Sequence, residues 1–178
     1  MPTNLEGEDE EVSMSMPQKS RRWMYRGRRP HALARVLNRG QAVLAARGIG
    51  PDRLVVLEVV GRRSGRTIAM PVVVADHHGE RYLVSMLGED TNWVRNVRAA
   101  GGSAVLRHGR AEDVLLEEVP PADRGKILRR YADLAPGARA HIGLRPRAPL
   151  CDFERIADRY PVFRITARSP SELAPAAR

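Results

Sequence analysis

The stretch VLEVVGRRSGRTIAMPVVVAD, residues 56–76, consists of two aliphatic runs separated by a short turn that carries three arginines. Aliphatic and β-branched runs joined by a few residues that include glycine are typical of antiparallel strands in a hairpin. Apolar runs at 54–60, 68–75 and 81–87 follow one another with connections of only a few residues. Parallel strands need crossovers of a dozen or more residues, so the sequence predicts an antiparallel meander and excludes a doubly wound parallel sheet.

Helical patterns lie before and after these strands. Residues 31–47 place Leu and Val at the spacing of one helix face, and glycines follow at the predicted end. The other predicted elements are a short helix after Thr91, a hairpin that turns at His108 and Gly109, a helix that begins at Pro120, a second helix within 148–160 and a last strand at 161–166. This order predicts an α+β fold, an antiparallel barrel or sheet with flanking helices.

We expect one domain between two tails. The chain has 178 residues, the length of a single domain with modest extensions. Residues 1–30 contain an acidic block at 6–11 and a basic block at 19–29, a composition typical of disordered segments. Residues 31–166 carry all the predicted elements, and residues 167–178 are expected to fray.

The charge balance favours anionic partners. The formal net charge is +9 at pH 7, and residues 1–30 contribute almost none of it, so the excess belongs to the folded part. The single Cys151 excludes an internal disulfide framework and suits a reducing cytoplasm. No apolar run reaches the roughly 20 residues of a transmembrane helix, and the acidic start argues against a secretory signal.

The turn between the first two strands is a candidate anion site. Arg62, Arg63 and Arg66 stand beside Ser64 and Gly65, and we expect backbone N–H groups of the turn to be free to donate. Arginine presents a planar fork of donors that matches carboxylates and phosphates. The alternative is a solvated hairpin tip. The turn lacks the Lys-Ser or Lys-Thr ending of a P-loop, which excludes that class of phosphate site.

Three pieces in a fixed order resemble the deazaflavin-dependent nitroreductase and quinone reductase family, which uses coenzyme F420. They are the turn GRRSG with the later Pro71, then Ser85 with Gly88, then NWVRN with Trp93 and Asn96. The C-terminal FERIADRYPVFRI is similar to a subgroup of that family. The resemblance covers about residues 31–166 and implies a split β-barrel of the flavin-reductase or pyridoxamine-phosphate-oxidase type.

The resemblance also implies a cofactor site. The arginine-rich turn would grip the phosphate and the glutamate-bearing tail of F420, and the flavin-like ring would lie near the start of the Trp93 helix. The cofactor-binding residues implied in this way are Arg62, Arg63, Ser64, Gly65, Arg66, Met70, Pro71, Ser85, Met86, Gly88, Trp93 and Asn96. Ser85 is the expected catalytic residue, because its hydroxyl could orient an electron acceptor and no His, Asp or Glu lies in 70–73 or 85–88.

The chain departs from the family pattern at two places. Ile68 stands where relatives usually have a second arginine, and Arg66, two residues earlier in an alternating strand, would project to the same face and replace that contact. Met86 and Leu87 occupy a position where a Pro-Tyr pair is frequent. We therefore expect an unusually aliphatic substrate face.

The function expected from these features is transfer of hydride from reduced F420 to a quinone, a nitroaromatic or another conjugated electrophile. The first alternative is a barrel of the same fold that binds FMN or only carries F420, and the more distant one is a basic nucleic-acid-binding protein. The turn lacks the interleaved aromatics of single-strand binders, so no specific nucleic acid is expected. No metal site is expected, since the adjacent His77 and His78 have no companion ligands at metal spacing. The chain is expected in the cytoplasm as a monomer or homodimer, with residues 19–29 suited to contact the inner face of the membrane.

Overall fold

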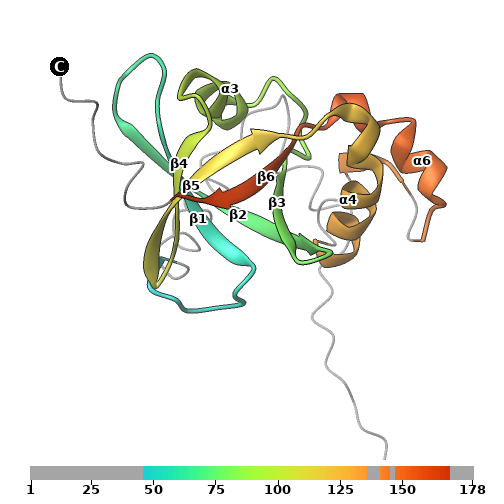
Figure 1. Cartoon of the computed structure of the whole chain (residues 1–178), viewed down its shortest axis with the longest axis horizontal. Coiled ribbons are helices and arrows are strands. Elements are labelled where there is room, and N and C mark those ends of the chain that lie inside the picture. Colours follow the sequence, from blue (N-terminus) through green and yellow to red (C-terminus); the bar gives the residue numbers. More distant parts are fainter. Residues whose placement is uncertain (1–45, 136–140, 145–146, 169–178) are drawn as a thin grey trace, which may run out of the picture.

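Six antiparallel strands form a closed barrel in this computed structural model, which describes residues 46–135, 141–144 and 147–168 (Figure 1). The strands are β1 (Leu54–Val60), β2 (Thr67–His77), β3 (Glu80–Val84), β4 (Ser103–His108), β5 (Arg110–Glu118) and β6 (Val162–Ala167). The helices are α3 (Asn92–Ala99), α4 (Pro121–Leu134), α6 (Leu150–Glu154) and the 3₁₀ turn η1 (Ala157–Arg159).

The predicted antiparallel barrel with flanking helices is confirmed. Around the barrel the strand order is β1-β2-β3-β6-β5-β4, and every neighbouring pair is antiparallel. The predicted hairpins 54–75 and 103–119 are present, whereas the predicted strand at 81–87 ends at Val84 and continues as a turn. The tail 1–30 and nearly all of the helix expected at 31–47 lie outside the described residues.

The inner core fills the barrel with aliphatic side chains from alternate positions of the strands. Val55, Leu57 and Val59 of β1 point inward and pack with residues of the other strands in one buried cluster. Helix α3 closes one end, because its Val94 and Val97 are fully buried in the same cluster. Burial of these two valines stabilises the lid, since each buried aliphatic side chain is worth roughly 1.5–3 kcal/mol.

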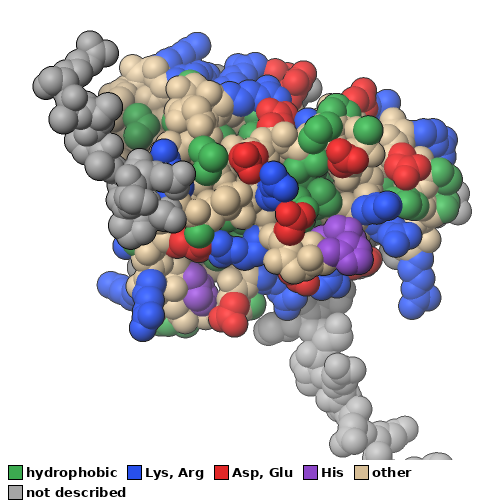
Figure 2. Space-filling view, in the orientation of Figure 1, with side chains coloured by type: hydrophobic (Ala, Val, Ile, Leu, Met, Phe, Trp, Pro, Cys, Tyr) green, Lys and Arg blue, Asp and Glu red, His purple; other side chains and the backbone are tan. Residues whose placement is uncertain are grey.

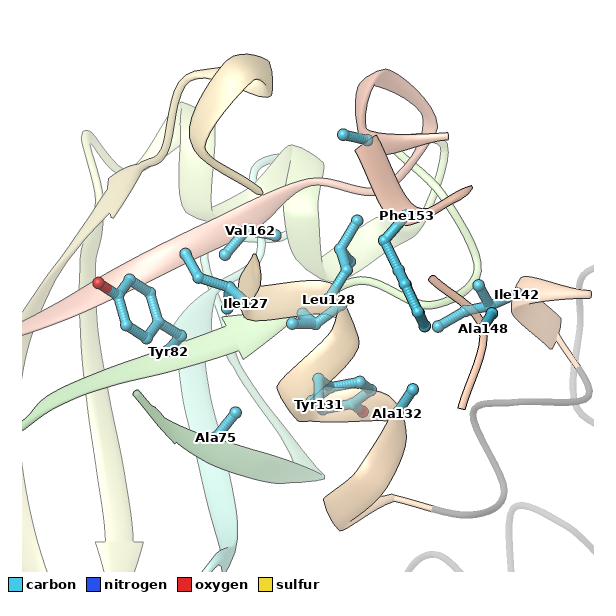
Figure 3. Packing of buried hydrophobic residues seen from close by; sticks show 12 residues of the cluster. Ala75, Tyr82, Ile127, Leu128, Tyr131, Ala132, Ile142, Ala148, Phe153 and Val162 are labelled. Carbon is cyan, nitrogen blue, oxygen red and sulfur yellow. The ribbon is translucent and has the colours of Figure 1, made fainter. Parts of the chain in front are cut away.

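A second core lies outside the barrel, between its wall and α4. Leu128 and Tyr131 of α4 point toward the sheet, and Figure 3 shows them facing the same packed layer as Tyr82 of β3 and Phe153 of α6. This layer covers one outer face of β2 and β3. The five-residue α6 buries Phe153 and leaves Cys151 exposed.

An ion-pair network joins the lid to this outer layer. Arg124 is 5% exposed and donates to Glu118 at 3.1 Å and to the carbonyl of Val119 at 2.7 Å. Glu118 also accepts two hydrogen bonds from Arg98 of α3, at 2.8 and 2.9 Å. The hydrogen bonds from Arg98 hold the pKa of Glu118 below its usual value. One carboxylate therefore links α3, β5 and α4.

We expect Glu118→Gln to destabilise the fold at neutral pH by about 1–3 kcal/mol, the range for hydrogen bonds to charged groups. Because the folded pKa of Glu118 is lowered, its stabilisation is present above the unfolded pKa of about 4.3 and is lost as the pH falls through the folded value. Urea unfolding at pH 7 and pH 3.5 should show the gap between the two proteins shrinking at the lower pH. An equal gap at both pH values would contradict the ionised network.

Candidate functional site

The turn between β1 and β2 is a tightly hydrogen-bonded structure. The N–H of Gly61 donates to the carbonyl of Arg66 at 2.9 Å, and the N–H groups of Ser64 and Gly65 both donate to the carbonyl of Gly61. A Cβ added at Gly61 would lie 2.8 Å from Ile68 Cδ1 and Ser64 Oγ and 3.2 Å from the carbonyl oxygen of Arg66, so a larger residue would require these groups to shift. The N–H of Arg66 donates to Ser64 Oγ at 3.3 Å. The expectation of free backbone donors is therefore wrong at Ser64, Gly65 and Arg66, and the side chains are left to bind ligands.

Arg62 attaches this turn to the lid helix. Its Nη1 donates to Asn96 Oδ1 at 2.8 Å, and its backbone N–H donates to the same oxygen at 3.3 Å. Its Nη2 lies 3.5 Å from Asn92 Oδ1, one helical turn earlier. Figure 1 shows the turn and α3 at the same end of the barrel. Both partners are neutral amides, so they orient the guanidinium without neutralising its charge.

Arg63 and Arg66 are exposed and have no ion pair or side-chain hydrogen bond to the described residues. The hydrogen bond from Gly61 to the Arg66 carbonyl lies one residue before β2 begins at Thr67, and the projection of Arg66 to the face of Ile68 stays a prediction from alternation. By contrast, many arginines elsewhere each lie within 4 Å of a carboxylate, namely Arg81, Arg95, Arg98, Arg107, Arg124, Arg130, Arg155 and Arg164. Figure 2 shows this mixing of acidic and basic side chains over one face. The turn thus concentrates three positive charges, and no acid in the described part of the chain contacts them.

The strand that follows the turn has a free edge. Residues 67–73 of β2 pair with β1, and β3 pairs only with Val74–His77. The hydrogen bonds from Gly61 to Arg66 and from Val74 to Arg53 show that the backbone N–H and C=O groups of even-numbered residues in β2 point toward β1. The backbone groups of Thr67 and Ala69 therefore point away from β1, to a side where no described strand pairs with them.

Pro71 interrupts this free edge, because it has no N–H group to offer. A second strand could not pair along the whole edge. What remains beside the arginines is a short row of exposed backbone donors and acceptors, which suits a small polar ring better than a peptide.

The turn from Ser85 to Thr91 leads from β3 into the lid helix. Ser85 is 1% exposed, and its Oγ donates to the carbonyl of Gly88 at 2.7 Å and lies 3.1 Å from Thr91 Oγ1. Gly88 has a φ of +88°, which favours glycine, and its N–H donates to the carbonyl of Ser85. The hydroxyl of Ser85 therefore serves the turn, and this arrangement offers no proton from it to a ligand.

The remaining residues expected at the ring separate onto different surfaces. Met70 is opposite Leu57 and packs against the inner core, so the next residue, Pro71, lies on the outer side of the wall. Met86 packs against the outer core. Trp93 packs against the inner core, with its ring 5.4 Å from that of Phe163. The side chains of Met70 and Pro71 thus cannot line one face of the same ring.

Sequence reasoning missed three features of the site. Asn92 lies one helical turn before Asn96, and this spacing was a readable signal. Thr91 completes the bonding of the Ser85 turn, and its place after Asp90 resembled an ordinary helix cap. The free edge at Thr67 and Ala69 had no signal, because it depends on which residues of β2 pair with β3.

The ionisable groups with displaced pKa values lie on other surfaces. Burial and the neighbouring Glu80 raise the pKa of Tyr82 to about 12, on the outer side of β3. Tyr82 also lines a cavity of about 380 Å³ between α4 and strands β3, β5 and β6, which contains none of the predicted site residues. Within the described ranges, no three His, Cys, Asp or Glu side chains are grouped to hold a metal, and no helix is long and apolar enough to cross a membrane. The site at the lid therefore offers cationic forks and backbone donors to an anionic ligand with a polar ring.

A family model described as F420H(2)-dependent quinone reductase matches residues 30–142. The structure is similar to one titled "Structure of F420-H2 Dependent Reductase (FDR-A)", at 18% identity over 64% of this chain and 94% of that chain with a TM-score of 0.46. It is also similar to an F420 reductase, at 14% identity over 71% of this chain and 92% of that chain with a TM-score of 0.43.

A third similar structure is a putative pyridoxamine 5'-phosphate oxidase from Listeria innocua, at 12% identity over 66% of this chain and 85% of that chain with a TM-score of 0.45. No curated protein matches the chain. The family model covers well over half of the 178 residues, including the arginine-rich turn, the Ser85 turn and the lid helix. On that match, the chain belongs to the F420H(2)-dependent quinone reductase family.

Proposed function

We propose that this F420-dependent reductase binds the anionic tail of its cofactor at the turn between β1 and β2 and reduces a quinone at the adjoining free edge of β2. The observation that carries the proposal is the concentration of Arg62, Arg63 and Arg66 with no contacting acid among the described residues. Clustered cations without a contacting acid raise the local positive potential and attract anions, whereas eight other described arginines each lie within 4 Å of a carboxylate.

The residues present fit F420 in charge and in donor type. Its tail carries a phosphate and glutamate carboxylates, and the exposed forks of Arg63 and Arg66 match such groups in geometry. Its ring has a polar edge, for which the exposed backbone groups of Thr67 and Ala69 provide partners. FMN carries one phosphate and would use fewer of the cations, so the site favours the longer polyanion.

When bound, reduced F420 supplies a hydride, that is two electrons, to a conjugated acceptor. The chain contributes orientation and exclusion of water. The lid helix closes the barrel with Val94 and Val97, and the Ser85 turn fixes where that helix begins. No His, Asp or Glu occurs in residues 61–71 or 85–88, so the acceptor's proton would come from solvent.

Binding and turnover test this function directly. Oxidised F420 and FMN are titrated separately into the purified protein, with cofactor fluorescence as the signal, and reduced F420 is then mixed with a menadione-like quinone or a nitroimidazole. We expect tighter binding of F420 than of FMN and faster oxidation of reduced F420 by the quinone. Tighter binding of FMN would refute the cofactor assignment, and binding of F420 without turnover of either acceptor would indicate a carrier.

Arg63→Ala should weaken F420 binding by about 1–1.5 kcal/mol, or roughly five- to tenfold, because an exposed charge-assisted hydrogen bond lies at the low end of its usual range. The matched control is Arg129→Ala, which removes an exposed arginine from α4. Its affinity for F420 should stay within twofold of the parent. Equal weakening in both variants would show a general effect of net charge and would remove the turn from the binding site.

Ser85→Ala should act through the structure of its turn. Loss of the 2.7 Å hydrogen bond from Ser85 leaves the Gly88 carbonyl with only the longer bond from Thr91 Oγ1, at 3.3 Å, and should lower stability by about 1–2 kcal/mol. At saturating F420, turnover should fall less than threefold. Thermal unfolding and single-turnover kinetics check this pair of effects. A tenfold loss of turnover with unchanged stability would instead make Ser85 the residue that orients the acceptor.

A further inference from the structure

Arg62 binds the amide oxygen of Asn96, whereas Arg107 binds a carboxylate. Asn96 is 2% exposed, and its Oδ1 accepts two hydrogen bonds from Arg62, one from the guanidinium at 2.8 Å and one from the backbone at 3.3 Å. Elsewhere a carboxylate has this role: Arg107 donates to both oxygens of Glu58 at 2.8 and 3.2 Å. Asp has nearly the same shape as Asn, so the geometry alone does not require an amide at residue 96.

The difference between the two side chains is charge. A carboxylate at residue 96 would form an ion pair with Arg62 and cancel the field that attracts an anion. The amide orients Arg62 and leaves its full charge. A guanidinium has five N–H donors, and Arg62 uses two of them on Asn96 and Asn92, so the other three have no partner among the described residues.

We propose that Asn96 and Asn92 form a neutral latch. They are positioning residues that hold Arg62, and with it the whole turn, against the lid helix, while they preserve the charge of Arg62 for the anionic tail of F420. Asn96 is buried with its oxygen occupied, so it acts through Arg62 and does not contact the cofactor. This inference rests on the proposed cofactor site and adds how the charge of that site is maintained.

The charge part of the proposal is tested with Asn96→Asp. Dissociation constants are measured for F420 and for the same deazaflavin without phosphate and glutamates. We expect about a tenfold or larger increase for F420, the range for loss of a hydrogen bond to a charged group, and less than a twofold change for the tailless compound. Asn92→Asp, at an exposed position, should act in the same direction more weakly. Ala122→Asp on α4 adds the same charge elsewhere and should change neither constant by more than twofold.

The positioning part is tested with a double-mutant cycle. Asn96→Ala should weaken F420 binding in the parent protein and should have less than a twofold effect in an Arg62→Ala background, because both changes remove one latch. Equal effects in the two backgrounds would show that Asn96 contacts the cofactor itself. Thermal unfolding of each variant identifies any that fails to fold, and Asn92→Asp then provides the result.

The outcomes separate this inference from the proposed function. If the parent protein fails to bind F420, the cofactor site is wrong and the latch falls with it. If the parent binds F420 but Asn96→Asp weakens the full and the tailless compounds equally, or weakens neither, the site stands and the latch is refuted.

Discussion

The change of partner along β2 is the constraint on which this structure depends. The strand has eleven residues, and it pairs with β1 over 67–73 and with β3 only from Val74 onward. This change of partner lets the sheet bend and close into a barrel, since β2 pairs with β1 along its first part and with β3 along its last part. It also leaves Thr67 and Ala69 with a free edge directly beside the arginine-rich turn. Closure of the barrel and exposure of the site thus have the same cause.

Charge placement gives this edge its chemistry. Around most of the barrel the arginines are bound to carboxylates, which makes those surfaces electrically mixed. At the turn the neighbours of Arg62 are Asn92 and Asn96, and Arg63 and Arg66 contact no described acid. Part of the excess positive charge behind the net charge of +9 therefore lies at the turn, where a polyanionic cofactor could bind.

Much of the fold could be predicted from the sequence, because hairpin-length connections exclude parallel pairing and aliphatic runs identify the strands. The ordered motifs also indicated the family. Details of the site were beyond the sequence for physical reasons. Whether Ser85 is buried depends on a turn closed by Gly88, and the opposite facing of Met70 and Pro71 depends on register. In the same way, hydrogen bonds within the turn occupy the backbone N–H groups of Ser64 and Gly65, which the sequence had suggested would be free.

We propose that the turn between β1 and β2, which contacts no described acid, holds the anionic tail of F420 while the free edge of β2 meets its ring. A crystal structure of the protein with oxidised F420 tests it most directly. The account predicts phosphate or carboxylate oxygens within hydrogen-bond distance of the Arg63 and Arg66 guanidinium groups, and ring atoms hydrogen-bonded to backbone groups of Thr67 or Ala69. A tail bound elsewhere, for example in the cavity between α4 and β6, with the turn unoccupied, would contradict it.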